Sequence, residues 1–310
     1  MDYIHIVTQM LMLFGVVLTG FAATRRGLWD PALNRRMSVF VLNVSAPCLI
    51  LASVMGEGLV FEPEEIMQLM LVSVLNHVLL IGGAYFFSFS GLRPAMSAER
   101  RGLLRFMLTF GNVTFIGFPV VCAIFGQRSV FYASVLTIPF NVLIFTVGVN
   151  FVTGSGRLRE AFRPRLLFSP CVVAALAAVV IALFKWQTPA PVAGWFHLVG
   201  DMTVPTALLI IGSTLSGIPV RDVLSGRFVY TMAAIRLLLM PLIILTVFRL
   251  LGLDRFVTNV AVVLSAMPVG VNGVMFCLQY GRDERLMAQG IFLTTLLSVV
   301  TIPLVALALC

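Results

Sequence analysis

The chain has 310 residues, of which 60% are apolar and only 11% are charged, and its mean hydropathy is +1.04. Soluble chains have about 45–50% apolar and about 25% charged residues, so the composition excludes an ordinary soluble protein and predicts a multi-pass membrane protein. The formal net charge is +8. Because the basic residues lie in short connections between apolar runs, they indicate orientation signals facing anionic lipid rather than a nucleic-acid surface.

Ten apolar runs follow one another along the chain, each close to the roughly 20 helical residues that cross a bilayer. They cover residues 4–23, 37–55, 66–90, 103–125, 129–152, 168–186, 199–216, 228–251, 257–279 and 286–309. The stretch Gln187–Leu198, which contains Pro189 and Pro191, is interpreted as an interfacial turn between the sixth and seventh spans. The connections are short, so no soluble domain is predicted.

The distribution of basic residues predicts the orientation. Of the 21 basic residues, sixteen fall in the connections after the odd-numbered spans, four fall on the opposite side, and Arg236 lies within a span. The positive-inside rule therefore places the odd-numbered connections in the cytoplasm and both termini outside. We expect a multi-pass protein of a bacterial inner membrane, with both ends of the chain on the periplasmic side.

The two halves of the chain share short motifs. SVLTIPF at residues 134–140 returns as SVVTIPL at residues 298–304, and NVSAP at 43–47 corresponds to DMTVP at 201–205. Each proline is expected to break or kink its helix. A unit of five spans must enter the membrane upside down when it is repeated, so the motifs predict an inverted repeat. We expect a first repeat at residues 1–152, a cytoplasmic linker at 153–167 and a second repeat at 168–310.

The fourth and ninth spans are the least helix-like of the ten. Both carry an asparagine, a proline and glycines near the middle, namely Gly111, Asn112, Gly117 and Pro119 in the fourth and Pro268, Gly270, Asn272 and Gly273 in the ninth. Non-helical backbone at membrane depth needs protein or a wet cavity around it. Two helices broken at equivalent positions would point the positive ends of half-helices at a common midplane site, which favours an anion.

The segments GNVTFIGFPVVCAIFG at 111–126 and AMPVGVNGVMFCLQYG at 266–281 resemble the auxin efflux carrier family, which includes bacterial malate-permease-like and malonate-transporter-like members and the plant PIN carriers. The resemblance implies an all-α integral membrane fold of ten helices. In this fold two inverted five-helix repeats cross at the broken helices four and nine, as in bile-acid symporters. It further implies a scaffold of spans one, two, six and seven, and a transport domain of spans three to five and eight to ten that moves as an elevator. A homodimer is expected by analogy. The linker at 153–167 is short, which argues against a regulated plant carrier.

Polar residues at the breaks are the main site candidates. Asn112 and Asn272 are expected to bind substrate, and the alternative is that each caps the backbone freed at its break. Further substrate-binding candidates are Thr114, Asn43 and Asn141, the last of which lies close to Pro139 and could satisfy its exposed carbonyls. The residues expected to shape the helix breaks and their crossing are Pro119, Pro268, Gly117 and Gly270.

Three ionisable residues need an explanation at membrane depth. A charge at the helix centre costs at least about 2.5–3.5 kcal/mol, so Arg236 either neutralises an anionic substrate or snorkels to the cytoplasmic face. His77 could carry a coupled proton or make a polar contact between helices. Asp201 could bind a cation or a proton, or it could cap the start of the seventh helix.

These features predict a secondary transporter of small organic anions, such as malate, malonate or an indole carboxylate. An inside-negative potential expels a dianion, which favours uncoupled export or uptake coupled to protons. The alternatives are a sodium-coupled organic-anion symporter of the bile-acid type and a non-transporting membrane sensor. A cation/proton antiporter is disfavoured because spans four and nine contain no acidic residue.

An enzyme is not predicted, because no HExxH motif, Asp pair or phosphate-binding loop is present. The five cysteines lie in apolar runs without metal-ligand spacing, so neither a metal nor a cofactor is expected. The expected partners are the lipid bilayer and the small anion, with proton or sodium coupling left open and no nucleic acid.

Overall fold

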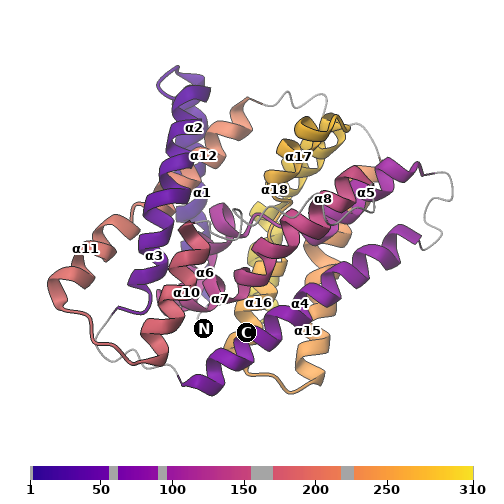
Figure 1. Ribbon diagram of the computed structural model, residues 1–310. Coiled ribbons are helices and arrows are strands. Elements are labelled where there is room, and N and C mark those ends of the chain that lie inside the picture. The colour runs from indigo at the N-terminus through magenta and orange to yellow at the C-terminus, as the bar shows by residue number, and fades with distance from the viewer. Residues whose placement is uncertain (1–2, 56–61, 90–95, 155–169, 218–226, 310) are drawn as a thin grey trace.

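A computed structural model describes residues 3–55, 62–89, 96–154, 170–217 and 227–309 (Figure 1). Within these ranges every regular element is a helix, apart from one isolated antiparallel bridge between Gly111 and Val269. The all-helical class predicted from the sequence is therefore confirmed. Most of the expected linker, residues 153–167, lies outside the described residues.

The helical elements often follow one another without a gap, and π-helical turns are labelled η. In chain order they are α1 (Tyr3–Arg25), α2 (Pro31–Phe40), η1 (Val41–Ser45), α3 (Ala46–Ala52), α4 (Pro63–Phe89), α5 (Ala98–Thr109), η2 (Val113–Gly117), α6 (Phe118–Phe125), α7 (Arg128–Leu143), η3 (Ile144–Gly148), α8 (Val149–Thr153), α10 (Pro170–Leu183), α11 (Ala190–Gly200), α12 (Thr203–Ser216), α14 (Arg227–Ala234), η5 (Ile235–Leu239), α15 (Met240–Leu250), α16 (Arg255–Ser265), α17 (Asn272–Tyr280) and α18 (Glu284–Ala308).

Six helical segments of the described chain are long and apolar enough to cross a membrane. They are Pro31–Ala52, Pro63–Phe89, Arg128–Thr153, Ala190–Thr214, Arg227–Leu250 and Glu284–Ala308. Shorter apolar helices cover Leu11–Arg25, Val113–Phe125, Pro170–Leu183 and Arg255–Ser265. These segments fall within or beside the apolar runs identified in the sequence, and they are consistent with an integral membrane protein.

Proline was the least reliable guide to helix ends. The interfacial turn expected at Gln187–Leu198 is wrong, because α11 begins at Ala190 with Pro191 in its first turn. Proline fits the first turn of a helix well, since the N–H it lacks would be unpaired there anyway. Pro139 and Pro303 of the repeated heptapeptides lie inside α7 and α18, and neither ends its helix.

The outward face of α4 illustrates the surface expected in lipid. Large apolar side chains are exposed along one stripe at Met67, Leu71, Val74 and Val78, spaced three or four residues apart. Residues on the opposite face, including the polar Asn76 and His77, are buried. A helix that is apolar outside and carries its polar groups inside matches a membrane environment rather than water.

The helices gather in two groups. Helices α1, α2, α3, α10, α11 and α12 pack against one another on the left of Figure 1, and α4, α5 and α14 to α18 lie mainly on the right. The closest pairing is between α1 and α12, where small residues let the backbones approach. A Cβ atom at Gly212 would overlap the Val17 carbonyl oxygen, and one at Gly20 would overlap that of Leu209.

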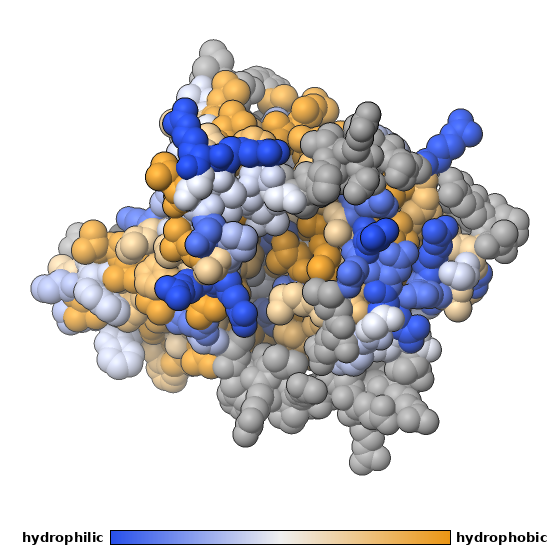
Figure 2. All heavy atoms as spheres, turned by 90° about the horizontal axis from the view of Figure 1, so that it is seen from above, coloured by the Kyte–Doolittle hydropathy of each residue, from blue (hydrophilic) through white to orange (hydrophobic). Residues whose placement is uncertain are grey.

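Two described connections that carry arginines lie on the same side of the molecule. The α1–α2 and α17–α18 connections are both at the top of Figure 1, whereas the α15–α16 connection is at the bottom. Figure 2 looks onto that top side and shows groups of hydrophilic side chains among hydrophobic ones. Exposed arginines here include Arg25, Arg26, Arg35 and Arg36. The structure thus separates a basic side from the opposite one.

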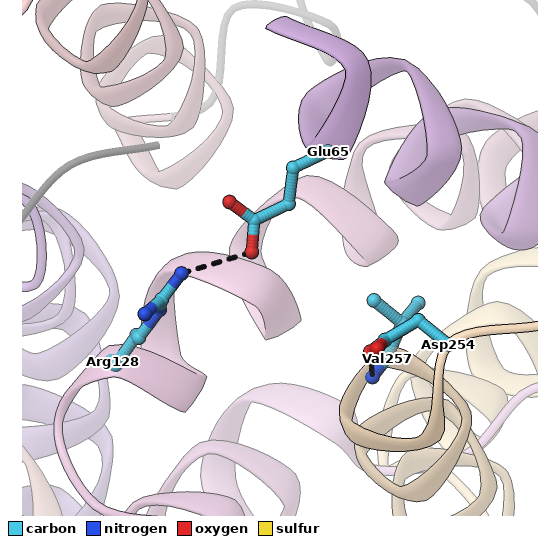
Figure 3. Close-up of polar contacts among 4 residues, drawn as sticks. All are labelled: Glu65, Arg128, Asp254 and Val257. Atoms are coloured by element: carbon cyan, nitrogen blue, oxygen red, sulfur yellow. Dashed lines mark hydrogen bonds and ion pairs between the residues drawn. The ribbon is translucent and has the colours of Figure 1, made fainter. Parts of the chain in front are cut away.

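Polar contacts tie down helix ends on the opposite side. Figure 3 shows Arg128, at the start of α7, paired with Glu65 in the first turn of α4 at 3.0 Å. The same figure shows Asp254, which caps α16 by accepting a hydrogen bond from the Val257 amide at 2.9 Å. An exposed ion pair contributes about 0–1 kcal/mol and a cap about 1 kcal/mol, so these contacts mainly fix the geometry of the helix ends.

Candidate functional site

The two interrupted helices bond to each other at their breaks. Between α5 and η2, the backbone N–H of Asn112 donates to the Pro268 carbonyl at 2.7 Å. Between α16 and α17, the backbone N–H of Gly270 donates to the Phe110 carbonyl at 3.0 Å. Gly111 and Val269 face each other between these bonds as an antiparallel bridge. Backbone groups that leave the helical pattern at each break are thus satisfied by the other break, as burial in an apolar surrounding requires.

The residues expected to shape the breaks divide into two kinds. Pro268 and Gly270 lie in the interruption itself and take part in the paired bonds. Pro119 and Gly117 instead lie beyond the first interruption, where η2 and α6 have already resumed the helix. The structural counterpart of the Pro268 break is therefore the segment around Gly111, which sequence comparison of the prolines does not reveal.

A cavity of about 330 Å³, called the larger cavity, adjoins this pair of breaks. It brings together five of the predicted substrate-binding residues, Asn43, Asn112, Thr114, Asn141 and Asn272, from four separate parts of the chain. Aromatic side chains, among them Phe115, Phe140, Phe145 and Phe276, form much of the remaining wall. No charged side chain lines this cavity among the described residues, so it offers amides, a hydroxyl and helix ends.

The amides in the larger cavity differ in what they have left to offer. Asn43 and Asn141 each donate through Nδ2 to the carbonyl four residues earlier in the same helix, at 2.8 and 2.9 Å. For Asn141 this acceptor is the Thr137 carbonyl, whereas the helical bond that Pro139 cannot make would go to the Val135 carbonyl, so the role predicted for Asn141 beside Pro139 stays a prediction. Asn112 uses Oδ1 to accept from the Phe115 amide at 3.3 Å, which also confirms that it caps freed backbone.

The side-chain N–H donors of Asn112 and Asn272 are therefore available to a bound molecule. The Nδ2 group of Asn112 and the side chain of Asn272 make no hydrogen bond within the described part of the chain. Asn112 begins η2 and Asn272 begins α17, and the first N–H groups of a helix have no acceptor inside it. Two positive helix ends and two amide donors thus meet at the larger cavity.

Asn112 also borders a second cavity, of about 220 Å³, between α2, α12 and α18. Its wall combines aliphatic and aromatic side chains with five polar ones, namely Asn34, Ser38, Asn112, Thr214 and Thr295. Asn112, Phe115 and Val271 line both cavities, so the two spaces meet at the helix breaks. Sequence patterns do not reveal the residues contributed by α2 and α12, because their polar groups resemble ordinary helix-end residues.

Both cavities lie toward the basic side of the molecule. Asn34 is near the start of α2, Thr214 is near the end of α12, and Cys171 is in the first turn of α10. Each of these helix ends adjoins a connection that carries arginines in the sequence. The positions of the lining residues indicate access from that side.

Arg236 does not line the larger cavity. It is 1% exposed and lies behind the breaks, where it faces a small cavity of about 20 Å³ with Asn76, His77 and Thr109. Its Nε donates to the Met267 carbonyl at 3.1 Å, and its Nη1 donates to the Leu108 carbonyl at 2.8 Å. Direct contact with a guest in the larger cavity and snorkelling to the surface are both inconsistent with this buried position.

Neither of the other two ionisable candidates lines the larger cavity. His77 is buried in the small cavity, with Nδ1 at 2.7 Å from the Ser73 carbonyl of its own helix. Asp201 is exposed in the turn between α11 and α12 and lines neither of the two main cavities. Within the described residues no group of three or more His, Cys, Asp or Glu side chains could hold a metal ion.

One supporting residue was missed in the sequence. The Val269 amide, next to the paired breaks, donates to the Thr294 hydroxyl of α18 at 3.1 Å. Thr294 is fully buried, and its neighbour Thr295 lines the second cavity. Two adjacent threonines in the middle of an apolar run are a signal that could have identified this segment.

Comparison with known proteins also points to membrane transport. A family model described as "Membrane transport protein" matches residues 5–164 and 157–306. The chain is similar to an uncharacterized transporter of Methanothermobacter thermautotrophicus, with 27% identity over 93% of each chain. It is 24% identical to a putative malonate transporter of Rhizobium meliloti over 62% of each chain. It is 23% identical to the uncharacterized transporter YfdV of Escherichia coli over 96% of this chain and 95% of that protein.

Proposed function

The chain belongs to the membrane transport protein family, the auxin efflux carrier family that its motifs resemble, and from this premise we propose that it carries small organic anions across the membrane. The substrate class is a mono- or dicarboxylate. One observation carries the proposal: the paired helix breaks present the starts of η2 and α17, with Asn112 and Asn272, to a cavity without acidic lining residues. Helix N-termini and amide donors recognise carboxylates.

The size and lining of the site support a small carboxylate. A volume of about 330 Å³ is at the lower end of the roughly 300–1,000 Å³ typical of small-molecule sites. The similarity to a putative malonate transporter makes malonate the first compound to test. The second cavity, which also reaches Asn112 and has aliphatic and aromatic residues in its wall, would accommodate an apolar substituent, so longer or aromatic carboxylates belong in the same screen.

The proposed architecture is ten spans in two inverted repeats, residues 1–152 and 168–310, that cross at the paired breaks. The reciprocal bonds Asn112 to Pro268 and Gly270 to Phe110 support this arrangement, because they have the form expected of a local two-fold relation. Helices α1, α2, α3 and α10 to α12 pack mainly on one another and also contact α6, α7 and α18, and this grouping supports a scaffold and a transport domain that moves against it as an elevator.

The direction of transport follows from the negative charge of the substrate and from the side on which the larger cavity opens. With the arginine-rich side in the cytoplasm and both termini outside, the larger cavity faces the cytoplasm. Each negative charge expelled by an inside-negative potential of 100 mV gains about 2.3 kcal/mol, so export needs no coupled ion. Uptake would need protons or sodium, with His77 and Asp201 as the sequence candidates for coupling.

Flux measurements test the proposal. The full chain in liposomes should carry radiolabelled malonate or malate, faster when a potential favours movement of the anion. Asn112→Ala and Asn272→Ala should each lower flux at low substrate concentration by about tenfold or more, because each removes a hydrogen bond to a charged group. The matched control is Asn259→Ala, since Asn259 is as buried as Asn112 but lines neither main cavity.

The alternatives give different results. A bile-acid-type symporter would show flux only with sodium, and a non-transporting sensor would bind a carboxylate without flux. If no carboxylate is carried or bound under any gradient, the anion-carrier proposal fails. If carboxylates are carried equally well by both asparagine variants, the site assignment fails and the carrier assignment stands.

A further inference from the structure

Arg236 binds the C-terminal ends of both interrupted helices at once. Its Nη1 donates to the carbonyls of Leu108 and Thr109, the last two residues of α5, at 2.8 and 3.4 Å. Its Nε donates at 3.1 Å to the carbonyl of Met267, which follows the end of α16. The carbonyl end of a helix carries a partial negative charge, so the guanidinium bridges two negative ends from opposite halves of the chain.

The acceptors around Arg236 are those of a cation site. Its hydrogen-bond partners are all backbone carbonyl oxygens, and no acidic side chain among the described residues forms an ion pair with it. In transporters with broken helices, half-helix C-terminal ends and unwound carbonyls coordinate the coupling sodium or proton. Here the corresponding position is occupied by the Arg236 side chain of the protein itself. Arg236 is buried and belongs to η5, in the middle of its membrane span.

The guanidinium is also close to the anion site. Gly111 lines both the small cavity that holds Arg236 and the larger cavity. A Cβ atom at Gly111 would overlap Nη2 of Arg236, so only the Gly111 backbone separates the positive charge from the larger cavity at this point. In a low-dielectric surrounding a charge acts strongly over such a separation.

From this geometry we propose that Arg236 is a tethered cation that takes the place of a coupling sodium ion at the helix breaks. It holds α5 and α16 together and supplies a permanent positive field to the anion site, as a positioning residue rather than a ligand. Transport is consequently independent of sodium. The effect on transport rests on the anion-carrier function proposed above, whereas the cation-site assignment itself does not.

Chemical rescue tests the assignment. Arg236→Ala should leave a hole lined by carbonyls, and malonate flux in liposomes should fall by about tenfold or more because charged hydrogen bonds are lost. Millimolar guanidinium chloride should restore flux several-fold, whereas urea, which has the same shape without the charge, should not. Arg249→Ala is the control, since Arg249 is on the same helix segment but exposed near its far end.

Two further measurements separate this inference from the proposed function. The wild-type chain should carry malonate equally in sodium chloride and choline chloride, and this comparison needs no variant. Without any substrate, guanidinium but not urea should raise the melting temperature of purified Arg236→Ala. Wild-type flux that requires sodium, unchanged flux in Arg236→Ala, or equal effects of urea and guanidinium would overturn the tethered-cation assignment. A chain that carries no malonate, but whose variant is stabilised by guanidinium alone, would leave it standing.

Discussion

The backbone N–H of Asn112 donates a hydrogen bond of 2.7 Å to the carbonyl of Pro268, and these two residues lie in opposite halves of the chain. At the second break Pro268 has no N–H to give and its ring prevents the helix from continuing normally, whereas the first break, at Phe110–Asn112, contains no proline; both breaks leave backbone groups without helical partners. The bond shows how the two interruptions resolve this together. It also fixes Asn112 where the two main cavities meet.

Thr294 should be essential to the stability of the paired breaks. Thr294→Val keeps the shape of the side chain but removes the hydroxyl that accepts from the Val269 amide at 3.1 Å. A buried N–H left without an acceptor costs about 1–3 kcal/mol, so we expect the free energy of unfolding to fall by about that amount. Denaturant unfolding in detergent would measure the loss.

The neighbouring residue supplies the control for Thr294. Thr295 donates to the Ile291 carbonyl of its own helix, a contact that α18 can lose without leaving a backbone group unpaired. Thr295→Val should change the free energy of unfolding by less than about 0.5 kcal/mol. Equal losses in the two variants would show that the Thr294 contact has no special role.

Gly111 should tolerate no side chain. A Cβ atom there would overlap the guanidinium of Arg236 and lie 3.2 Å from the Met267 carbonyl. Gly111→Ala should therefore displace the arginine from its acceptors and lower the free energy of unfolding by about 2–3 kcal/mol, the cost of overpacking. Gly15→Ala, at a helical position with open space around it, should change stability by no more than about 1 kcal/mol. An unaffected Gly111→Ala variant would contradict the close approach of Arg236.

Local patterns were the most predictable part of this molecule. Apolar runs located the helical segments, and the Gly, Asn and Pro clusters located both interruptions. Asn43, Asn112, Thr114, Asn141 and Asn272, chosen from those patterns, lie around one cavity. Their role in binding a substrate stays a prediction, as do the inverted repeat and its direction in the membrane.

Features that depend on contacts between distant parts of the chain could not be predicted from local sequence patterns. Nothing in the sequence around Arg236 indicates that its acceptors are carbonyls of α5 and of the segment after α16. The identical prolines of the heptapeptides suggested breaks in α7 and α18, but the helices continue through them. One missing N–H removes a single helical bond, and packing on neighbouring helices outweighs that loss. The turn expected at Gln187–Leu198 was interpreted wrongly for a similar reason, because a proline can begin a helix, here α11, as well as end one.

Close packing of α1 against α12 gives a third prediction. A Cβ atom at Gly212 would overlap the Val17 carbonyl, a backbone atom that cannot turn aside as a side chain could. Gly212→Ala should push the two helices apart and lower the free energy of unfolding by about 1–3 kcal/mol. Gly194→Ala in α11, where nothing lies within 4 Å, is the matched control. Similar melting temperatures for the two variants would count against tight α1–α12 packing.

Access to the larger cavity gives a fourth prediction, which tests the proposed orientation. Met275 lines this cavity and is 65% exposed, so a cysteine placed there would be within reach of water-soluble reagents. In a chain whose native cysteines are replaced, Met275→Cys should react with an impermeant maleimide added to the cytoplasmic side. Bound malonate should slow that reaction several-fold, because it occupies the same space.

The comparison position is Leu28, which is 75% exposed in the α1–α2 connection and lines neither main cavity. Malonate should leave the labelling rate of Leu28→Cys unchanged, since no substrate would lie over it. The side from which Met275→Cys reacts decides the orientation, because the cavity lies toward the arginine-rich connections, which the proposed orientation places in the cytoplasm. Labelling of Met275→Cys from the periplasmic side alone would reverse the proposed orientation, while protection by malonate would still locate the substrate in the larger cavity.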